Sequence, residues 1–324
     1  MKPLALFSKG KKRDSGDAPT PKRKGFSLTM EKRENVAGWL FATPLILGLL
    51  LFTLVPMVMS LIWAFKDYDG LTVDRWIGFG NFVHMFNDDE LPNVIKNTFV
   101  YTFCSIPINL ILSYLLAWLV NNDHKFTKVF RVLYYLPCVI PAVVSGLLWK
   151  DITGNTYGIF NKILTSIGLP AATFFSEPST AMLTLLMMNI WNVGSGMILW
   201  LSAFKGIPKT LYEAAKIDGA NGLQRFAHIT IPMSTPVIFF NLVTSVIGSL
   251  QYNGTMVIAG DSSRMGRGVE DSLYLYGVKI YNTAFADGQL GYASALAWVL
   301  CIFIAILTFI LFKTSKWVFY GENQ

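Results

Sequence analysis

The sequence predicts an all-α membrane protein with about six transmembrane helices, and three observations point to this class. Of its 324 residues, 53% are hydrophobic and only 15% are charged, whereas a soluble domain carries about 25% charged residues. The apolar residues lie in runs of about 20, the length that an α-helix needs to cross a bilayer. These runs lack the alternation of membrane-spanning strands, so helices must satisfy the backbone inside the lipid.

The chain begins with a basic segment, residues 1–36, which holds ten of the 27 Lys and Arg residues. It contains the runs KGKKR and PKRK and also Pro, Gly and Ser. We expect a disordered cytoplasmic tail here, and an electrostatic tether to anionic lipid is the alternative. Residues 37–320 then form the transmembrane domain.

Six apolar segments follow the tail. We expect spans at residues 35–65, 97–120, 132–149, 180–204, 236–258 and 290–312. The first three spans hold five prolines, each of which removes a backbone donor and kinks a helix: Pro44, Pro56, Pro107, Pro137 and Pro141. Such kinks suit either ordinary bundle packing or a bundle that bends around a cavity.

The basic residues predict the orientation of these spans in the membrane. With the tail in the cytoplasm, the inner regions are 1–36, 121–131, 205–235 and 313–324, and they hold 19 of the 27 Lys and Arg residues. The first outer loop, 66–96, instead carries six Asp and Glu residues. We therefore expect a multi-pass cell-membrane protein with both termini in the cytoplasm. The net charge of +7 follows from this topology, and we expect no nucleic-acid partner.

No catalytic or metal-binding motif is found in the sequence. Cys104, Cys138 and Cys301 lie in apolar runs without metal or disulfide spacing, and the three His residues are scattered in polar connections. There is no GxxxxGK[ST] phosphate loop. Few if any ionisable side chains lie within the spans, which argues against a proton relay. We therefore expect no enzyme activity, no metal and no ATP hydrolysis on this chain.

Neutral polar side chains follow the fourth and fifth spans. In the fourth, residues from Asn189 to Trp200 recur at intervals of three and four, which is typical of one helix face. In the fifth, the same holds from Asn241 to Thr255. Such residues either hold membrane helices together or line a hydrogen-bonding path for an uncharged sugar or polyol. We assign the candidate path to Asn189, Asn192, Ser195, Gln251, Tyr252 and Asn253.

A polar stretch, EAAKIDGANGLQRFAHITIP at residues 213–232, separates these two spans. We expect a short helix at 210–218, ended by Gly219 in a left-handed conformation, and a second helix that starts at Asn221. Pro232 is expected to force the preceding residue out of the helix, so that a helix–turn–helix lies along the membrane before the fifth span begins. The small side chains of Ala214 and Ala215 leave a flat surface for another protein, and an ordinary interfacial helix is the alternative.

This stretch resembles the EAA signature of ABC importer permeases. That signature is EAA, three residues, Gly, nine residues, a hydrophobic pair around one residue, and Pro. The chain fills every position, with Ile231 where Leu is commoner. The segments YYLPCVIPAVVSGLLWKDITGNTYGIFN, IWNVGSGMILWLSAFKGIPKTLYEAAKIDGAN and GYASALAWVLCIFIAILTFILF are similar to carbohydrate-uptake permeases of the maltose type. The resemblance covers residues 36–320.

The resemblance implies a MetI-like core of five helices, the second to sixth spans, with an added N-terminal helix. It implies the permease subunit of a sugar importer that receives its solute from an extracytoplasmic binding protein. It further implies a second permease, most simply in a heterodimer, and an ATPase dimer that carries ATP and Mg. A permease for another polyol-like solute such as glycerol-phosphate, or a stand-alone secondary transporter, is the alternative. Within the cytoplasmic loop 205–235, the resemblance assigns ATPase coupling to Glu213, Ala214, Ala215, Asp218, Gly219, Ile229 and Pro232.

Overall fold

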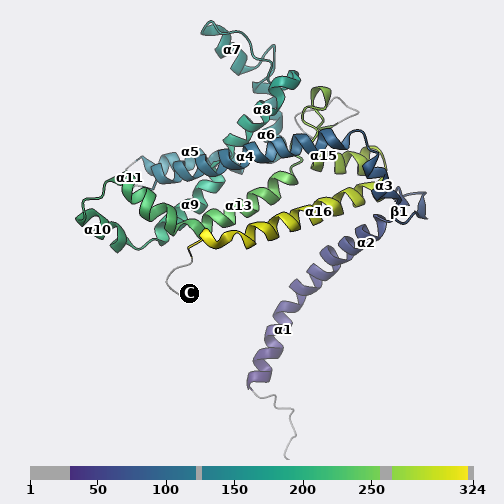
Figure 1. Ribbon diagram of the computed structural model, residues 1–324, viewed down its shortest axis with the longest axis horizontal. Coiled ribbons are helices and arrows are strands. Elements are labelled where there is room, and N and C mark those ends of the chain that lie inside the picture. Colours follow the sequence, from purple (N-terminus) through teal and green to yellow (C-terminus); the bar gives the residue numbers. More distant parts are fainter. Residues whose placement is uncertain (1–29, 122–125, 256–264, 320–324) are drawn as a thin grey trace, which may run out of the picture. The chain divides into compact units, whose positions relative to one another are not determined.

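The computed structural model describes residues 30–121, 126–255 and 265–319, and it consists almost entirely of helices (Figure 1). The chain divides into two compact units, residues 1–56 and 57–324. In the first unit, α1 (Met30–Leu49) leads into a π-helical turn, η1 (Leu50–Leu54). Helix α2 (Val55–Trp63) begins at the end of this unit and continues into the second. Residues 1–29 of the predicted tail lie outside the described residues, and α1 begins inside the range assigned to that tail.

The second unit is organised around α4 (Leu91–Leu119). Its 29 residues extend about 43 Å at 1.5 Å per residue, which exceeds the roughly 30 Å hydrocarbon core of a bilayer. Helices α8 (Pro178–Trp191), α9 (Gly194–Gly206) and α13 (Thr235–Leu250) all pack against α4. Helix α16 (Leu290–Lys313) packs against α13 (Figure 1).

The described chain has four helical segments long and apolar enough to cross a membrane, and up to six if two bent pairs each form one span. The continuous segments are Glu34–Trp63, Leu91–Leu119, Gly222–Leu250 and Leu290–Lys313. Helix α5 (Thr127–Val139) meets α6 (Ala142–Ile152) at 98°, and α8 meets α9 at 44°. The expected six spans are therefore accommodated, but the third and fourth are broken rather than straight.

The two breaks differ in their local structure. Before Pro141 the backbone of Ile140 is extended, with φ −71° and ψ 128°, as the steric effect of proline on its predecessor requires. No proline lies at the α8–α9 break. There, a Cβ on Gly194 would lie 1.9 Å from the backbone oxygen of Tyr134, so only glycine lets α9 pack this closely against α5.

One end of the second unit carries the only strands among the described residues, and we name it the strand end. Strand β1 (Lys66–Tyr68) pairs antiparallel with β2 (Asp74–Trp76). Around them lie α3 (Gly80–Phe86), the 3-10 turn η4 (Val269–Asp271), α15 (Tyr276–Tyr281) and the π turn η5 (Asn282–Ala286). Helix α7 (Ile159–Ser166) and the 3-10 turn η2 (Phe174–Ser176) connect α6 to α8, and η6 (Ser315–Trp317) follows α16.

The opposite end carries the EAA hairpin, residues 209–230 (Figure 1). It comprises α10 (Lys209–Ile217), α11 (Gly222–Arg225) and the π turn η3 (Phe226–Thr230), and α12 (Ile231–Met233) leads on to α13. The prediction that Pro232 ends this helix is wrong. Ile231 is helical, with φ −62° and ψ −54°, and the helix runs from Gly222 to Leu250. The second leg of the hairpin is therefore the start of the fifth span.

The π turn explains why Pro232 is tolerated. A proline lacks the N–H and its ring presses on the carbonyl four residues earlier. In η3 the ladder has widened, because the N–H of Ile231 bonds to the oxygen of Phe226, five residues back. Pro56 repeats the arrangement, since the N–H of Val55 bonds to the oxygen of Leu50 at the end of η1. π turns are a known cause of local helix adjustment.

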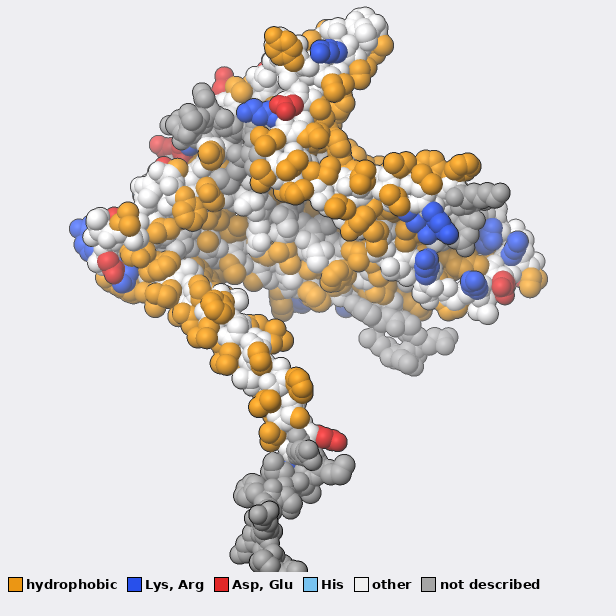
Figure 2. All heavy atoms as spheres, turned by 180° about the vertical axis from the view of Figure 1, so that it is seen from behind, with side chains coloured by type: hydrophobic (Ala, Val, Ile, Leu, Met, Phe, Trp, Pro, Cys, Tyr) orange, Lys and Arg blue, Asp and Glu red, His pale blue; other side chains and the backbone are white. Residues whose placement is uncertain are grey.

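Three buried apolar clusters are found among the described residues of the second unit. The largest includes Tyr101, Leu185 and Leu296, and the second, toward the EAA hairpin, is built around Tyr114 and Trp200. The third consists of Phe239, Val243 and Val318. Outside these clusters, large hydrophobic side chains cover much of the surface, and Lys and Arg gather at the end that carries the hairpin (Figure 2). An apolar flank of this kind is what a bundle in contact with lipid requires.

Candidate functional site

The first leg of the EAA hairpin forms as the sequence predicts. Helix α10 has Pro208 at its N-cap, and Gly219 follows its C-cap with φ +80°. The turn satisfies the last carbonyls of the helix, because the N–H of Ala220 bonds to the oxygen of Ala215 at 2.9 Å. This left-handed glycine ending fixes the angle between the two legs.

The second leg begins with a capping box. The side chain of Asn221 accepts the backbone N–H of Gln224 at 2.9 Å, and the side chain of Gln224 accepts the N–H of Asn221 at 2.8 Å. This reciprocal pair satisfies two donors that a helix start leaves open. Both legs therefore have ends that their own sequence stabilises.

A cleft of about 320 Å³ lies between the two legs. It brings together four of the predicted coupling residues, which are Ala215, Asp218, Gly219 and Ile229. Glu213 and Ala214 lie on the exposed surface of α10 and Pro232 is half-buried, and none of the three lines the cleft. Sequence reasoning missed the remaining lining residues, Ala220, Gln224, Arg225 and His228.

The hairpin also exposes two large apolar side chains. Ile217 is 86% exposed and Leu223 is 68% exposed, one on each leg beside the turn. Their neighbours Lys216 and Asp218 are polar and exposed, so this part of the chain is not a lipid-facing helix surface. Contiguous apolar patches rimmed by polar residues mark protein interaction sites, and these two side chains can contribute to such a patch.

A polar cavity of about 210 Å³ lies between α4, α8 and α13. At its centre, the amide of Asn189 donates to the hydroxyl of Tyr101 at 2.6 Å and accepts a hydrogen bond from Asn109. The ring of Tyr101 stacks on that of Tyr252, with centroids 4.8 Å apart. None of the described residues that line the cavity is charged, and its remaining walls are Ser105, Ile106, Ser245, Gly248 and Ser249.

The structure brings together only part of the predicted path. Asn189 and Tyr252 line the cavity, whereas the other four are exposed and lie outside it: Asn192, Ser195, Gln251 and Asn253. The prediction that the polar residues of each span share one continuous helix face is wrong. The fourth span breaks after Trp191, and α13 ends at Leu250. The expected end of the fifth span, residues 256–258, lies outside the described residues.

The contribution of α4 was missed by sequence reasoning. Tyr101, Ser105 and Asn109 follow each other at intervals of four and so share one face of that helix. Polar side chains that recur at intervals of three and four pointed to the fourth and fifth spans, and the same pattern would have pointed to these three residues. Trp200, by contrast, is 1% exposed and its indole donates to Ser113 at 2.8 Å, so it belongs to the packing of α9 on α4.

The strand end is held by a network of ion pairs. Lys279 lies 2.9 Å from Asp88 and 2.7 Å from Glu90, and Arg267 lies 2.7 Å from Glu90. Burial alone would raise the pKa of Asp88, but hydrogen bonds from Lys279, Tyr292 and the backbone of Glu90 outweigh it and lower that pKa. The pKa of Glu90 is lowered in the same way, with Lys279 and Arg267 outweighing burial.

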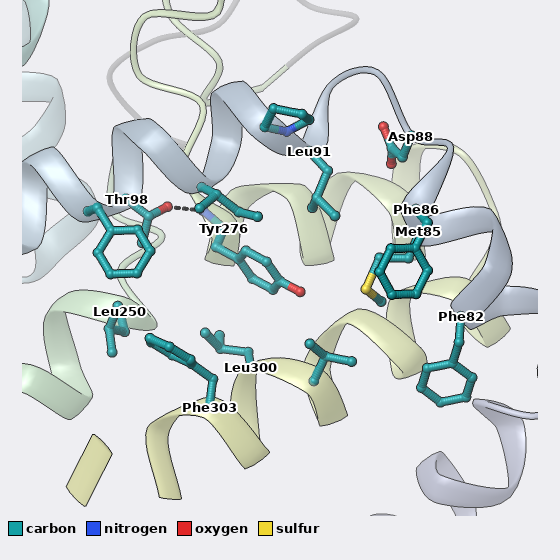
Figure 3. Close-up of a pocket in the computed structure, with 14 residues that line it drawn as sticks. Phe82, Met85, Phe86, Asp88, Leu91, Thr98, Leu250, Tyr276, Leu300 and Phe303 are labelled. Carbon is teal, nitrogen blue, oxygen red and sulfur yellow. Dashed lines mark hydrogen bonds between the residues drawn. The ribbon is translucent and has the colours of Figure 1, made fainter. Parts of the chain in front are cut away.

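An apolar groove of about 520 Å³ lies beside this network (Figure 3). Phe82, Met85 and Phe86 of α3 face Leu300 and Phe303 of α16 across it. One polar link crosses its wall, where the N–H of Tyr276 donates to the hydroxyl of Thr98 at 2.8 Å. Such a lining suits a lipid chain or another helix rather than a hydrated solute.

The chain matches the model of a protein family described as "Binding-protein-dependent transport system inner membrane component" over residues 98–317. It is 39% identical to the probable ABC transporter permease protein YesP of Bacillus subtilis over 90% of this chain and 95% of that protein. It is 31% identical to the lactose transport system permease protein LacF of Rhizobium radiobacter, over 89% of this chain and 97% of the relative.

A similar fold is seen in a solved structure of a bacterial alginate ABC transporter in complex with an alginate pentasaccharide-bound periplasmic protein. One chain of that structure aligns with a TM-score of 0.79 at 24% sequence identity, over 88% of this chain and 96% of that chain. At this identity the likeness concerns the fold.

Proposed function

The chain belongs to the family of binding-protein-dependent transport system inner membrane components, and from this premise we propose that it is the permease subunit of an ATP-driven sugar importer. The observation that carries the proposal is that one continuous helix joins the EAA hairpin to the polar cavity. One helix, Gly222–Leu250, begins in the exposed EAA hairpin and ends at the polar cavity. A push on the hairpin therefore acts on a helix that lines the proposed sugar path.

The proposed orientation places the EAA hairpin and both termini in the cytoplasm and the strand end outside. In support, Lys205, Lys209 and Lys216 are exposed at the hairpin end, and Lys and Arg gather there (Figure 2). Cytoplasmic loops carry an excess of such residues.

The proposed docking surface for the ATPase is the exposed part of the hairpin. Glu213, Ala214, Asp218 and Gly219 lie at this surface beside the apolar side chain of Ile217. ATP and Mg belong to the partner subunits in this proposal, and this chain supplies the surface that the ATPase moves. The cleft between the legs would receive part of the partner, through Ala215 and Ile229.

The proposed sugar path runs through the polar cavity. Amide and hydroxyl groups of Asn109, Asn189 and Ser245 can exchange hydrogen bonds with sugar hydroxyls, and the face of an aromatic ring suits the apolar face of a sugar. Asn192 and Gln251 are exposed outside it, where a second permease subunit would complete the path. The name of the lactose relative supports a sugar as solute.

Reconstitution with the cognate binding protein and ATPase tests the proposal. Uptake and sugar-stimulated ATP hydrolysis would be measured for a panel of neutral mono- and oligosaccharides, a uronate-bearing disaccharide and glycerol-phosphate. We expect one neutral sugar to stimulate both activities. Stimulation by glycerol-phosphate alone, or uptake without ATP, would contradict the proposal.

Substitution of Gly219 tests the docking surface in the same assay. The residue has a left-handed backbone that Asn and Asp tolerate better than other side chains, and a Cβ there meets no atom within 4 Å. We expect Gly219→Asp, which adds a charge to the turn, to uncouple ATP hydrolysis from uptake, and the matched Gly219→Asn to do so less. Normal transport by Gly219→Asp with the ATPase bound would refute docking at this turn.

A further inference from the structure

An aromatic anchor joins the EAA hairpin to the rest of the bundle. We define the anchor as Tyr114 and Trp118 of α4, Trp200 and Phe204 of α9, and Phe226 of η3. The ring of Phe226 lies 4.7 Å from that of Trp118 and 5.7 Å from that of Tyr114, measured between centroids. Tyr114 in turn meets Trp200 at 5.0 Å and Phe204 at 5.1 Å.

A second contact ties the same helix to α4 beyond Pro232. The hydroxyl of Tyr114 lies 2.7 Å from that of Ser234. Because the Ser234 hydroxyl already donates to the oxygen of Thr230 at 2.7 Å, it accepts the hydrogen from Tyr114. Ser234 is 1% exposed and Tyr114 is 9% exposed, so the bond is shielded from water.

These contacts straddle the weakest part of the helix. Between Phe226 and Ser234 the helix contains both the π turn η3 and Pro232, where backbone hydrogen bonds are altered or absent. An unsupported helix would bend there and absorb a displacement of the hairpin. Tyr114 fixes the helix on both sides of this point, and Tyr212 braces the first leg through a 2.9 Å contact with the hydroxyl of Thr230.

We propose that Phe226 and Tyr114 are positioning residues that transmit the displacement of the EAA hairpin to α4 and α9. This inference rests on the proposed function. Helix α4 carries Tyr101 and Asn109 of the polar cavity, and α9 continues from α8, which carries Asn189. The anchor therefore connects the hairpin to walls of the cavity that its own helix does not supply.

The test is the number of sugar molecules imported per ATP hydrolysed by the reconstituted complex, with lactose and maltose as probes. We expect Phe226→Ala to lower this ratio about tenfold, within the range of coupling between distant sites, while ATP hydrolysis and binding of the ATPase persist. Phe226→Tyr keeps the ring and should restore the ratio. The matched control is Phe240→Ala, on the same helix but 58% exposed, and it should leave the ratio unchanged.

Two further variants keep the inference testable if Phe226→Ala does not assemble. Tyr114→Phe and Ser234→Ala each remove the bond beyond Pro232 and should lower the ratio about threefold, as expected for one hydrogen bond. A wild-type ratio in Phe226→Ala, or in both of these variants, would overturn the inference and leave the proposed function intact.

A second measurement needs no sugar. The thiol of Cys138 lies 3.4 Å from the oxygen of Asn192, at the break between α8 and α9, so movement of α9 changes its surroundings. We expect vanadate-trapped ATP to change the rate of Cys138 alkylation in the wild-type complex and to have no effect in Phe226→Ala. If the wild type imports neither probe, the choice of sugar fails while this measurement still decides the role of the anchor, and an equal response in both proteins would overturn it.

Discussion

The two ends of the bundle are held by opposite kinds of contact. All six ion pairs found among the described residues lie at the strand end, where Lys279, Asp88, Glu90 and Arg267 form one network. At the other end, the anchor between the EAA hairpin and the bundle consists of ring contacts and hydroxyl bonds.

This difference matches what each end would have to do in transport. Buried ion pairs hold one geometry, because separating them leaves charges without partners in a medium that solvates them poorly. Aromatic pairs remain favourable over a range of centroid distances and tilts, so the hairpin stays attached to α4 and α9 while these helices change their tilt. The strand end is therefore built to stay fixed, and the EAA end to move without coming apart.

The largest expected effect comes from Lys279→Met. It removes a side chain that is 7% exposed and leaves Asp88, itself 8% exposed, without its main partner. Loss of one member of a buried pair costs about 3–5 kcal/mol, and thermal unfolding in detergent should show a correspondingly lower transition temperature.

The matched control is Lys66→Met. Its partner Asp74 is 57% exposed, and such a surface pair contributes at most about 1 kcal/mol. Equal effects of the two variants would show that the network is not what holds the strand end.

Much of the fold could be predicted because the relevant signals are local. Apolar runs of sufficient length gave the spans, and Gly219 gave the turn of the hairpin through its own backbone preference. Pro232 was mispredicted because its effect depends on surroundings that are distant in sequence. The pre-proline preference acts at Pro141, where the chain bends by 98°, but at Pro232 the widened π turn and the bond between Tyr114 and Ser234 keep the helix intact.

The cavity and the ion network could not be predicted from the sequence for a related reason. Asn189 meets Tyr101 across 88 positions, and Arg267 meets Glu90 across 177. Such pairs depend on which helices become neighbours, and periodicity within one span says nothing about that. The charges of the first outer loop predict the orientation in the membrane, but their partners Arg267 and Lys279 lie in a segment without a recognisable motif.

Acid should loosen the strand end and leave the EAA end unchanged. The folded-state pKa values of Asp88 and Glu90 are lowered, so their contribution to stability is complete above the ordinary values of 3.8 and 4.5 and is lost as pH falls through the folded values. The loss of stability should be smaller than in Lys279→Met, because the carboxyl groups protonate one after the other and still accept hydrogen bonds.

Hydrogen exchange, corrected for its intrinsic pH dependence, should increase in residues 265–281 and not in α9. Asp88→Asn with Glu90→Gln should abolish the acid-dependent increase, and an equal increase at both ends would contradict the distinction between them.

The smallest expected effect is at the EAA end, with Trp200→Phe. The change keeps an aromatic ring beside Tyr114 and removes only the indole N–H that donates to Ser113 at 2.8 Å. Loss of one such bond costs about 1 kcal/mol, so the temperature of the thermal transition should fall slightly.

A double-mutant cycle with Ser113→Ala separates the contribution of the hydrogen bond from that of the ring. If the bond is the main contribution, the double variant should be little less stable than either single one. A loss as large as that of Lys279→Met would mean that the anchor is a rigid polar joint. The ring contacts would then not be what carries the motion of the hairpin to α4.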